Sequence, residues 1–521
     1  MPALSAIDLA MFLLESPERP FNIGPLVLLR PPAGFKGSFA DKLTTKMLKR
    51  PVGAPFSYRL QLSLTSAPSV VPVDDPDPKP HVHRLTLKNA STEALLKKVC
   101  ELHEPVLDRS GMLWQFWVID GLADGRVALY AKVHHGLIDG RGFVRAVTQW
   151  LSADPKDRTV RALWEGMPRA SAGHARDAGL LKNLLKAGGQ AGGMLKSAAG
   201  VAGLLAEQGL RATGLGKGTA LPFMKVPDAF GGELSPQRVF AYCKLPLDQM
   251  KTLGKAHGAT INDLLLTVVD QAMHRYLAER GSAALKSLVA DMPVALSDTA
   301  KGGNQIAVLQ FPLGAPAASL RDRLAAIRAE TARLKTSLGK RASDTAMLYT
   351  TLVHALPLMV ERVARNAAPR LANLLISNPF GFPGERYLMG ATVEAALPIS
   401  LVSAGHKLNV TAVTLGNHLQ ISFLAMPEAA PRIERLARFT EQAFEELAQV
   451  LSGTPQAATA GPTGQAPGRA RKPKVAAKTA ASRKAVARPP AKKSRSPQRK
   501  KTASRPTAAP RRARPSTTQA S

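Results

Sequence analysis

The stretch VALYAKVHHGLIDG, residues 127–140, decides the fold of the region around it. Apolar residues occupy every second position from Val127 to Val133, which predicts a buried strand. After Gly140 the apolar residues fall at helical spacing. We therefore expect His135 in a loop between a strand and a helix, where regular structure holds a side chain that still faces a cleft.

The pair His134-His135, followed by Asp139-Gly140, is a candidate catalytic motif. A neutral imidazole can accept a proton from an alcohol as the alcohol oxygen attacks a carbonyl carbon. We assign His135 as the general base and His134 as its packed or hydrogen-bonded neighbour. Asp139 would orient the loop and the ring, and Gly140 would leave room for close backbone approach. The alternative is structural: both histidines are satisfied in the core, and Asp139 caps the next helix.

Short motifs elsewhere in the chain add to this one. They are Leu4 to Asp8 with Met11 to Glu15, Leu107-Asp108-Arg109, Leu113-Trp114, Thr260 to Asp263, Gly303-Asn304, Ile376 to Asn378, Tyr387 to Gly390, Pro398 to Ser400 and Leu408 to Thr411. In this order the series resembles the bacterial wax ester synthase/diacylglycerol acyltransferase family. The resemblance implies an α/β fold with two coenzyme A-dependent acyltransferase-like domains, of the chloramphenicol acetyltransferase type, joined by a helical linker.

The resemblance also implies a reaction. A fatty acyl group moves from acyl-coenzyme A to diacylglycerol or a long-chain alcohol, which gives triacylglycerol or wax ester. Acyl-coenzyme A is then a co-substrate, and we expect no bound cofactor and no metal. By the same resemblance His135 is the base, while Asn262, Asp263 and Trp114 bind substrate or shape the site. From the residues alone, an N-cap or first-turn role after Thr260 is an equal alternative for Asn262 and Asp263.

The chain departs from the family pattern in three segments. Met112 replaces a proline before Leu113-Trp114, residues 379–382 read Pro-Phe-Gly-Phe, and residues 293–297 lack the family's arginine. These changes leave the expected base in place and bear on substrate preference and turnover. They motivate one alternative, a catalytically weakened relative that binds lipid bodies and is tethered to DNA or membrane by its basic tail. A further alternative is an acyltransferase with another small-molecule acceptor, such as a polyketide or an amine.

Length and composition set further limits. A chain of 521 residues is long enough for two cores. Two cysteines are too few for a disulfide framework. The first apolar stretch contains Asp8 and Glu15 and has no basic leader, and no apolar run reaches the length of a membrane span. We expect a cytoplasmic protein that associates peripherally with the inner membrane or with lipid bodies.

Composition along the chain predicts four parts. Residues 1–165 form the first acyltransferase-like domain, 166–232 a helical linker and loop, 233–453 the second domain, and 454–521 a disordered tail. The apolar stripe near residues 177–211 predicts either a connector packed on both halves or a helix at a membrane surface. Within the second domain, the spacing predicts helices over 264–277 and 433–451 and a strand pair over 408–413 and 419–424.

The tail concentrates positive charge. The whole chain has a formal charge of +32, and residues 455–521 contain 18 Lys or Arg and no Asp or Glu. Such a segment cannot bury enough apolar area to fold. Its single sign of charge favours nucleic acid or anionic lipid as a partner, with a tail that has no specific partner as the alternative.

Other motifs of known chemistry are weak or missing in the sequence. His81 and His83 alternate as on one face of a strand, yet no clustered carboxylates or cysteines accompany them, so a metal site is not favoured. The sequence has no phosphate-binding Gly-Lys-Ser loop, no dinucleotide fingerprint and no catalytic serine elbow.

Overall fold

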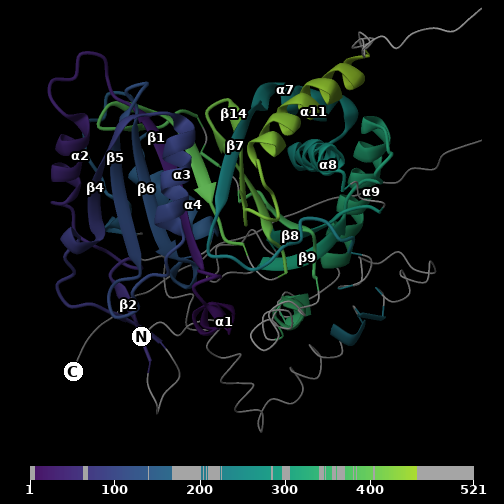
Figure 1. Cartoon of the computed structure of the whole chain (residues 1–521), viewed down its shortest axis with the longest axis horizontal. Coiled ribbons are helices and arrows are strands. Elements are labelled where there is room, and N and C mark those ends of the chain that lie inside the picture. The colour runs from purple at the N-terminus through teal and green to yellow at the C-terminus, as the bar shows by residue number, and fades with distance from the viewer. Residues whose placement is uncertain are drawn as a thin grey trace, which may run out of the picture. The chain divides into compact units, whose positions relative to one another are not determined.

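The computed structural model of the chain contains two six-stranded sheets with helices packed on them (Figure 1). Met1–Ala457 form one compact unit. The sequence-based expectation of an α/β fold with two sheet domains is confirmed. The structure describes residues 6–453 except 63–68, 139, 167–200, 204, 207, 209–222, 224–225, 283–285, 296–305, 340–344, 347, 355–359, 361–369, 380, 383 and 403–404.

The first sheet has the strand order β11-β12-β1-β6-β5-β4. Its strands are β1 (Asn22–Arg30), β4 (Val82–Ala90), β5 (Trp114–Leu122), β6 (Val127–His134), β11 (Tyr387–Leu388) and β12 (Ala391–Ile399). Helices α2 (Phe39–Met47) and α4 (Gly140–Trp150) pack in the core on one face, and α3 (Thr92–His103) packs on the other. Every residue of β6 is buried, which confirms the predicted buried strand and extends the burial to both faces. A short hairpin of β2 (Tyr58–Gln61) and β3 (Ser69–Pro72) lies outside the sheet.

The second sheet has the order β7-β14-β13-β10-β8-β9. Its strands are β7 (Val239–Pro246), β8 (Val289–Ala295), β9 (Ile306–Pro312), β10 (Leu374–Ser377), β13 (Leu408–Leu415) and β14 (His418–Ala425). Its helices are α7 (Leu247–His257), α8 (Ile261–Glu279), α9 (Leu320–Gly339) and α11 (Glu434–Ser452), which gather on one side of the sheet in Figure 1. The predicted helices over 264–277 and 433–451 and the predicted strand pair are confirmed as α8, α11 and β13-β14.

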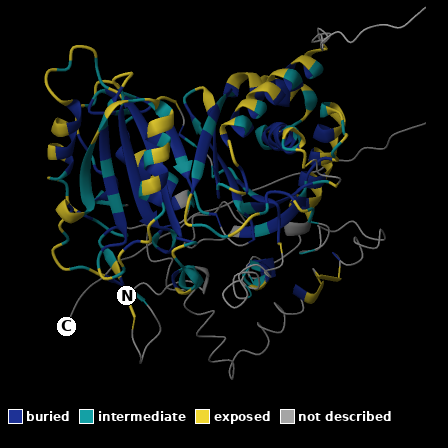
Figure 2. Ribbon diagram, viewed as in Figure 1, coloured by how far each residue is buried: buried dark blue, intermediate teal, exposed yellow. Residues whose placement is uncertain are grey.

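The two faces of the second sheet differ in chemistry. Apolar side chains such as Leu374, Val410 and Phe311 lie in the core with the helices. The opposite face carries buried polar residues, and Asn409 on this face donates to Leu401 O beyond the end of β12. This polar face is therefore turned toward the first sheet. Figure 2 shows the central strands of both sheets buried, while the edge strand β4 is only partly buried and exposed residues lie on the helices and loops.

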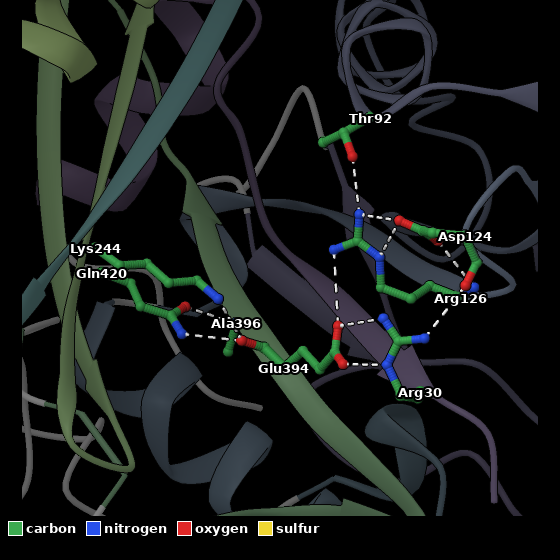
Figure 3. Close-up of polar contacts among 8 residues, drawn as sticks. All are labelled: Arg30, Thr92, Asp124, Arg126, Lys244, Glu394, Ala396 and Gln420. Carbon is green, nitrogen blue, oxygen red and sulfur yellow. Dashed lines mark hydrogen bonds and ion pairs between the residues drawn. The ribbon is translucent and has the colours of Figure 1, made fainter. Parts of the chain in front are cut away.

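Strand β12 connects the two halves. It follows β10 and β11 in the second half of the chain, yet it pairs with β1 along the register from Gly24 with Ile399 to Arg30 with Thr392. Its other edge pairs with β11 at Ala391 and Thr392, and beyond that pair it is closed by side chains of the second sheet, since the Ala396 N–H donates to Gln420 Oε1 over 2.8 Å. Beside this contact, Lys244 Nζ donates to Glu394 O over 2.8 Å, and the Glu394 carboxylate pairs with Arg30 (Figure 3).

Two predicted segments lie mostly or wholly outside the described residues. Most of the predicted linker helix near residues 177–211 lies outside the described residues, and so does the whole of 454–521. Among the helices that the structure describes, none is long and apolar enough to cross a bilayer.

Candidate active site

The histidine pair lies where β6 ends. His134 is the last residue of the strand, and His135–Leu137 form a 3-10 turn that precedes α4. The His134 N–H donates to Leu113 O over 3.0 Å, and the His135 N–H donates to Phe21 O over 2.8 Å. These bonds fix the turn to β5 on one side and to the start of β1 on the other. The predicted place of His135, between a strand and a helix, is confirmed.

His134 is fully buried and neutral. Its Nδ1 accepts a hydrogen bond from the Gly136 N–H over 3.0 Å, so the ring proton is on Nε2. The ring stacks parallel on Phe12 of α1 (Ala6–Leu14), with 4.0 Å between the centroids. Burial, with smaller contributions from His135 and Arg109, lowers the pKa of His134 to about 3. His134 is therefore a positioning residue, which fixes the turn through its bond to Gly136 and its stack on Phe12.

A buried carboxylate faces the other nitrogen of this ring. Glu15 Oε1 lies 3.6 Å from His134 Nε2, and only 2% of the Glu15 side chain is exposed. The Phe21 N–H donates to the same oxygen over 3.0 Å, and Arg109 donates to Oε2 over 2.9 Å. Because His134 is neutral, the ion pair of this cluster is the one between Glu15 and Arg109. Both residues stand in the motifs quoted above, but nothing in the local sequence signals a contact between residues 94 positions apart.

His135 is partly exposed, unlike its neighbour. Its Nδ1 is buried and has no hydrogen-bond partner among the described residues. The ring is thus not held through both nitrogens by fixed neighbours, as a general base requires. Asp139 lies outside the described residues, so its ring-orienting role and its capping role both stay predictions.

The glycine that makes room in this turn is Gly136. A Cβ at Gly136 would lie 2.6 Å from the Phe12 ring, which is too close. A Cβ at Gly140 would meet Pro379 Cβ at 3.9 Å, an ordinary contact. Gly136 therefore allows the Phe12 ring to pack over the first turn after the strand, while the close approach expected at Gly140 stays a prediction.

Asp263 has a capping role in the structure. Thr260 is the N-cap of α8, its Oγ1 accepts from the Asp263 N–H over 3.1 Å, and Asp263 Oδ2 accepts from the Thr260 N–H over 2.8 Å. Asp263 Oδ1 also accepts from Thr331 Oγ1 of α9 over 2.8 Å. Within the described part of the chain, the Asn262 side chain has no hydrogen-bond partner. The first-turn alternative is thus the one that the structure shows for Asp263.

Trp114 is a core residue of the first half. It is 2% exposed, its indole N–H donates to Phe56 O over 2.9 Å, and its ring stacks on Trp164 at 5.3 Å. His81 packs on the same indole at 4.8 Å and bonds to Trp114 O through Nδ1. These contacts account for His81, and no group of three metal-ligating side chains occurs among the described residues.

Lys132 is a buried cation on the strand face that also carries His134. It is 4% exposed, and its Nζ donates to Leu102 O over 2.8 Å. Burial lowers the pKa of Lys132 to about 8, although Glu15 and Glu104 act in the opposite direction. In the sequence, Lys132 alternates with the apolar residues of the strand, and this pattern places it on the less buried face, so it carried no predicted role.

Comparisons with known proteins agree with this arrangement. Residues 4–265 match the model of the wax ester synthase/diacylglycerol acyltransferase catalytic domain, and residues 302–448 match that of the WS/DGAT C-terminal domain. Probable diacylglycerol O-acyltransferase Tgs4 of Mycobacterium tuberculosis is 33% identical over 470 residues, which cover 87% of this chain and 98% of the relative. Its counterpart tgs2 from the same organism is 30% identical over 453 residues, which cover 85% and 98%.

Solved structures show the same fold. The wax ester synthase/diacylglycerol acyltransferase from Marinobacter aquaeolei VT8 has a TM-score of 0.65 at 23% identity, covering 86% of this chain and 100% of that one. The first condensation domain of the calcium-dependent antibiotic synthetase has a TM-score of 0.54 at 15% identity, covering 86% and 96%. At these identities the likeness concerns the fold alone. The matched domain models and the relatives above 30% identity show that the chain belongs to the wax ester synthase/diacylglycerol acyltransferase family, and is an acyltransferase.

Proposed function

We propose that the protein transfers a fatty acyl group from acyl-coenzyme A to the hydroxyl of diacylglycerol or of a long-chain alcohol, with His135 as the general base. The observation that carries the proposal is a partly exposed His135 on a turn that neutral, buried His134 fixes from behind. Membership of the family supports acyl transfer and both classes of acceptor.

The proposed reaction uses one imidazole and no covalent enzyme intermediate. His135 takes the proton of the acceptor hydroxyl while the oxygen attacks the thioester carbonyl carbon. The tetrahedral intermediate then collapses, the C–S bond breaks, and the coenzyme A thiolate takes the proton back from the imidazolium. We propose that acyl-coenzyme A is a co-substrate, because it supplies the acyl group and leaves as coenzyme A. Since no atom changes oxidation state, we also propose that no resident cofactor takes part.

The fixed turn matters for the rate of this reaction. A general base works only when its nitrogen lies within hydrogen-bond reach of the proton, and a misplacement of about 1 Å can cost about 100-fold in rate. The backbone bond from His135 to Phe21 and the stack of His134 on Phe12 hold the turn at two points. The rigid shell behind the motif thus supports a catalytic role for His135 rather than for His134.

Replacing His135 tests the assignment. With palmitoyl-coenzyme A and either hexadecanol or diacylglycerol, H135A should abolish the release of free coenzyme A. It should also abolish the ester product, which is separated by thin-layer chromatography. H418A is the matched control, because His418 is an exposed residue of β14. H135A activity within a few-fold of wild type would refute the assignment. Polyketide-like alcohols and amines in the same assay test the alternative acceptors.

We also propose that the basic tail brings the enzyme to anionic lipid. Diacylglycerol resides in membranes, and the 18 Lys or Arg of residues 455–521 carry no compensating acid. Full-length protein should float with phosphatidylserine vesicles at low salt and lose them at high salt, while a variant with neutral residues in place of the tail's Lys and Arg should not float. Preferential binding to duplex DNA would favour the alternative, in which a weakened relative coats lipid bodies and tethers them to DNA.

A further inference from the structure

A buried carboxylate in the second half holds two histidines. Asp291 of β8 is fully buried, and its Oδ2 lies 3.2 Å from His354 Nε2 and 3.0 Å from His406 Nε2. Its Oδ1 accepts from the Gln310 amide of β9 over 2.6 Å. Burial alone would raise the pKa of Asp291, but His354 and His406 lower it below its usual value. The carboxylate is therefore ionised, and both Nε2 atoms carry protons toward it.

The second nitrogen of His354 determines its charge. His354 Nδ1 lies 2.9 Å from Thr350 O, a backbone carbonyl that can only accept. Both ring nitrogens of His354 thus face acceptors, and this requires the imidazolium form. The pKa of His354 agrees with the geometry: burial lowers it, but Asp291 outweighs burial and the pKa is raised above the ordinary value.

The cluster joins three segments that the chain brings together only on folding. Asp291 belongs to β8, His354 to the helical residues 348–354, and His406 to the segment before β13. Tyr349 of the same helical segment bonds to Gln310 Oε1 over 3.4 Å and, through Gln208, to the region that precedes the second sheet. Burial raises the pKa of Tyr349 to about 12, so this phenol stays neutral.

The cluster lies on the polar face of the second sheet, the one turned toward the first. Asp291 pairs with Leu375 of β10, and both belong to the row that continues to Asn409 of β13. Farther along the same connection, Pro379 lies against Gly140, at the end of the active-site turn. Four residues lead from Leu375 to Pro379, so their Cα atoms lie at most about 14 Å apart. We call residues 375–379 the wall beside the active-site turn, and the cluster borders this wall through the pairing of Asp291 with Leu375.

We propose that Asp291, His354 and His406 form a proton-dependent positioning element, which holds this wall opposite the active-site turn while His354 is an imidazolium and loosens it when His354 loses a proton. The proposal rests on the proposed function for the place of the base. The described titratable groups that face His354 are Asp291 and, beyond it, His406 and Tyr349. None of the three touches His135 in the described structure.

The sign of the pH dependence follows from the raised pKa of His354. The stabilisation that protonated His354 gives to the folded cluster is fully present below a pH of about 6.5, the ordinary pKa of an imidazole. It is lost as the pH rises through the higher pKa of His354 in the folded protein. Asp291, with its lowered pKa, stays ionised throughout this range. We therefore expect the KM for the acceptor to rise on the alkaline side by at least about fivefold, a typical coupling between sites, while kcat changes less.

Two substitutions of His354 imitate its two protonation states. H354Q is neutral at every pH and should show the high acceptor KM of the alkaline form throughout. H354R keeps its charge and should show the low KM at both ends of the range. H418Q is the control on an exposed histidine. Initial rates of coenzyme A release between about pH 5.5 and 9.5 separate KM from kcat. A wild-type KM that is flat over this range would overturn the proposal.

A second measurement needs neither enzyme activity nor a variant. It therefore does not depend on how a variant folds or on whether His135 is the base. In the wild type, hydrogen–deuterium exchange of residues 348–354, corrected for intrinsic rates, should increase relative to α8 as the pH rises from about 6 to 9. If the exchange of residues 348–354 relative to α8 does not change with pH, the proposed proton-dependent element is refuted. If H135A keeps its activity, the proposed function fails, yet this exchange measurement still decides the role of His354.

Discussion

At the scale of single residues, the two adjacent histidines divide the work. His134 Nδ1 accepts from the Gly136 N–H and its Nε2 faces Glu15, while His135 keeps a nitrogen without a partner among the described residues. The difference arises because β6 is buried over its whole length and ends at His134. His135 begins the turn, where the chain leaves the sheet.

This division predicts different effects of two amides at His134. An Asn oxygen can replace Nδ1 as the acceptor for the Gly136 N–H, whereas the Gln amide nitrogen takes the place of Nε2. We expect H134N to retain more turnover than H134Q, because the bond to Gly136 shapes the turn directly. Neither should shift an acid limb above pH 4, since the pKa of His134 is about 3. Equal losses of kcat in both variants would contradict the role given to Nδ1.

The buried cation next to this pair predicts an unusual stability profile. The folded pKa of Lys132, about 8, lies below the ordinary value of about 10.4, so folding disfavours the charged form. The resulting penalty is full below pH 8 and fades as the pH rises toward 10.4. K132M should therefore unfold at a higher temperature than wild type at pH 7, with a smaller advantage at pH 10. Scanning calorimetry at the two pH values checks this, with K251M on exposed Lys251 as the control.

At the scale of elements, the start of α8 separates a structural from a catalytic reading. Asp263 caps the helix with Thr260 and bonds to Thr331 of α9. D263A should lower the free energy of unfolding by about 1–2 kcal/mol, as the loss of a cap does, with little change in kcat at a temperature where the variant is folded. N262A should stay within about 0.5 kcal/mol of wild type. Loss of turnover in N262A without loss of stability would restore the site-shaping role that the family resemblance implies.

Elements with a strong local pattern could be predicted from the sequence. The strand β6, the helices α8 and α11 and the hairpin β13-β14 each carry their period within one short stretch. The place of His135 between strand and helix followed from the same local signal. The pairing of β12 with β1 did not, because that strand lies more than 350 residues away from its partner and has no local feature that selects it.

The supporting shell of the site was beyond prediction for the same reason. Glu15 and Arg109 meet across 94 residues, and Asp291, His354 and His406 come from three segments. Family motifs marked Trp114 and Asp263 but did not say that they bond to Phe56 and Thr331. A local pattern can place an element and its faces, whereas the partner of a polar side chain depends on the complete fold.

At the scale of the whole molecule, the Gln420 amide is one of the side chains that connect the two sheets. Gln420 is 1% exposed and accepts from the Ala396 N–H on the open edge of β12, so Q420L leaves a buried N–H without a partner. That loss costs about 1–3 kcal/mol. The ion pair of Glu394 with Arg30 is far more exposed, and such pairs contribute about 0–1 kcal/mol. Q420L should therefore destabilise the protein more than E394Q does in urea unfolding, and the reverse order would show that the ion pair within the first sheet contributes more than the contact between the sheets.

The pairing of β12 with β1 also limits how the gene for this protein can be divided. A fragment that stopped after α4 would lack β11 and β12, and β1, whose Leu26 to Leu29 are fully buried in the intact chain, would become a bare sheet margin. An unpaired apolar margin recruits other chains and aggregates. Fission of the gene near residue 200 should thus yield an insoluble first product unless the second is made beside it in the same cell. Fusion partners and tags belong at the ends of the chain rather than between its lobes.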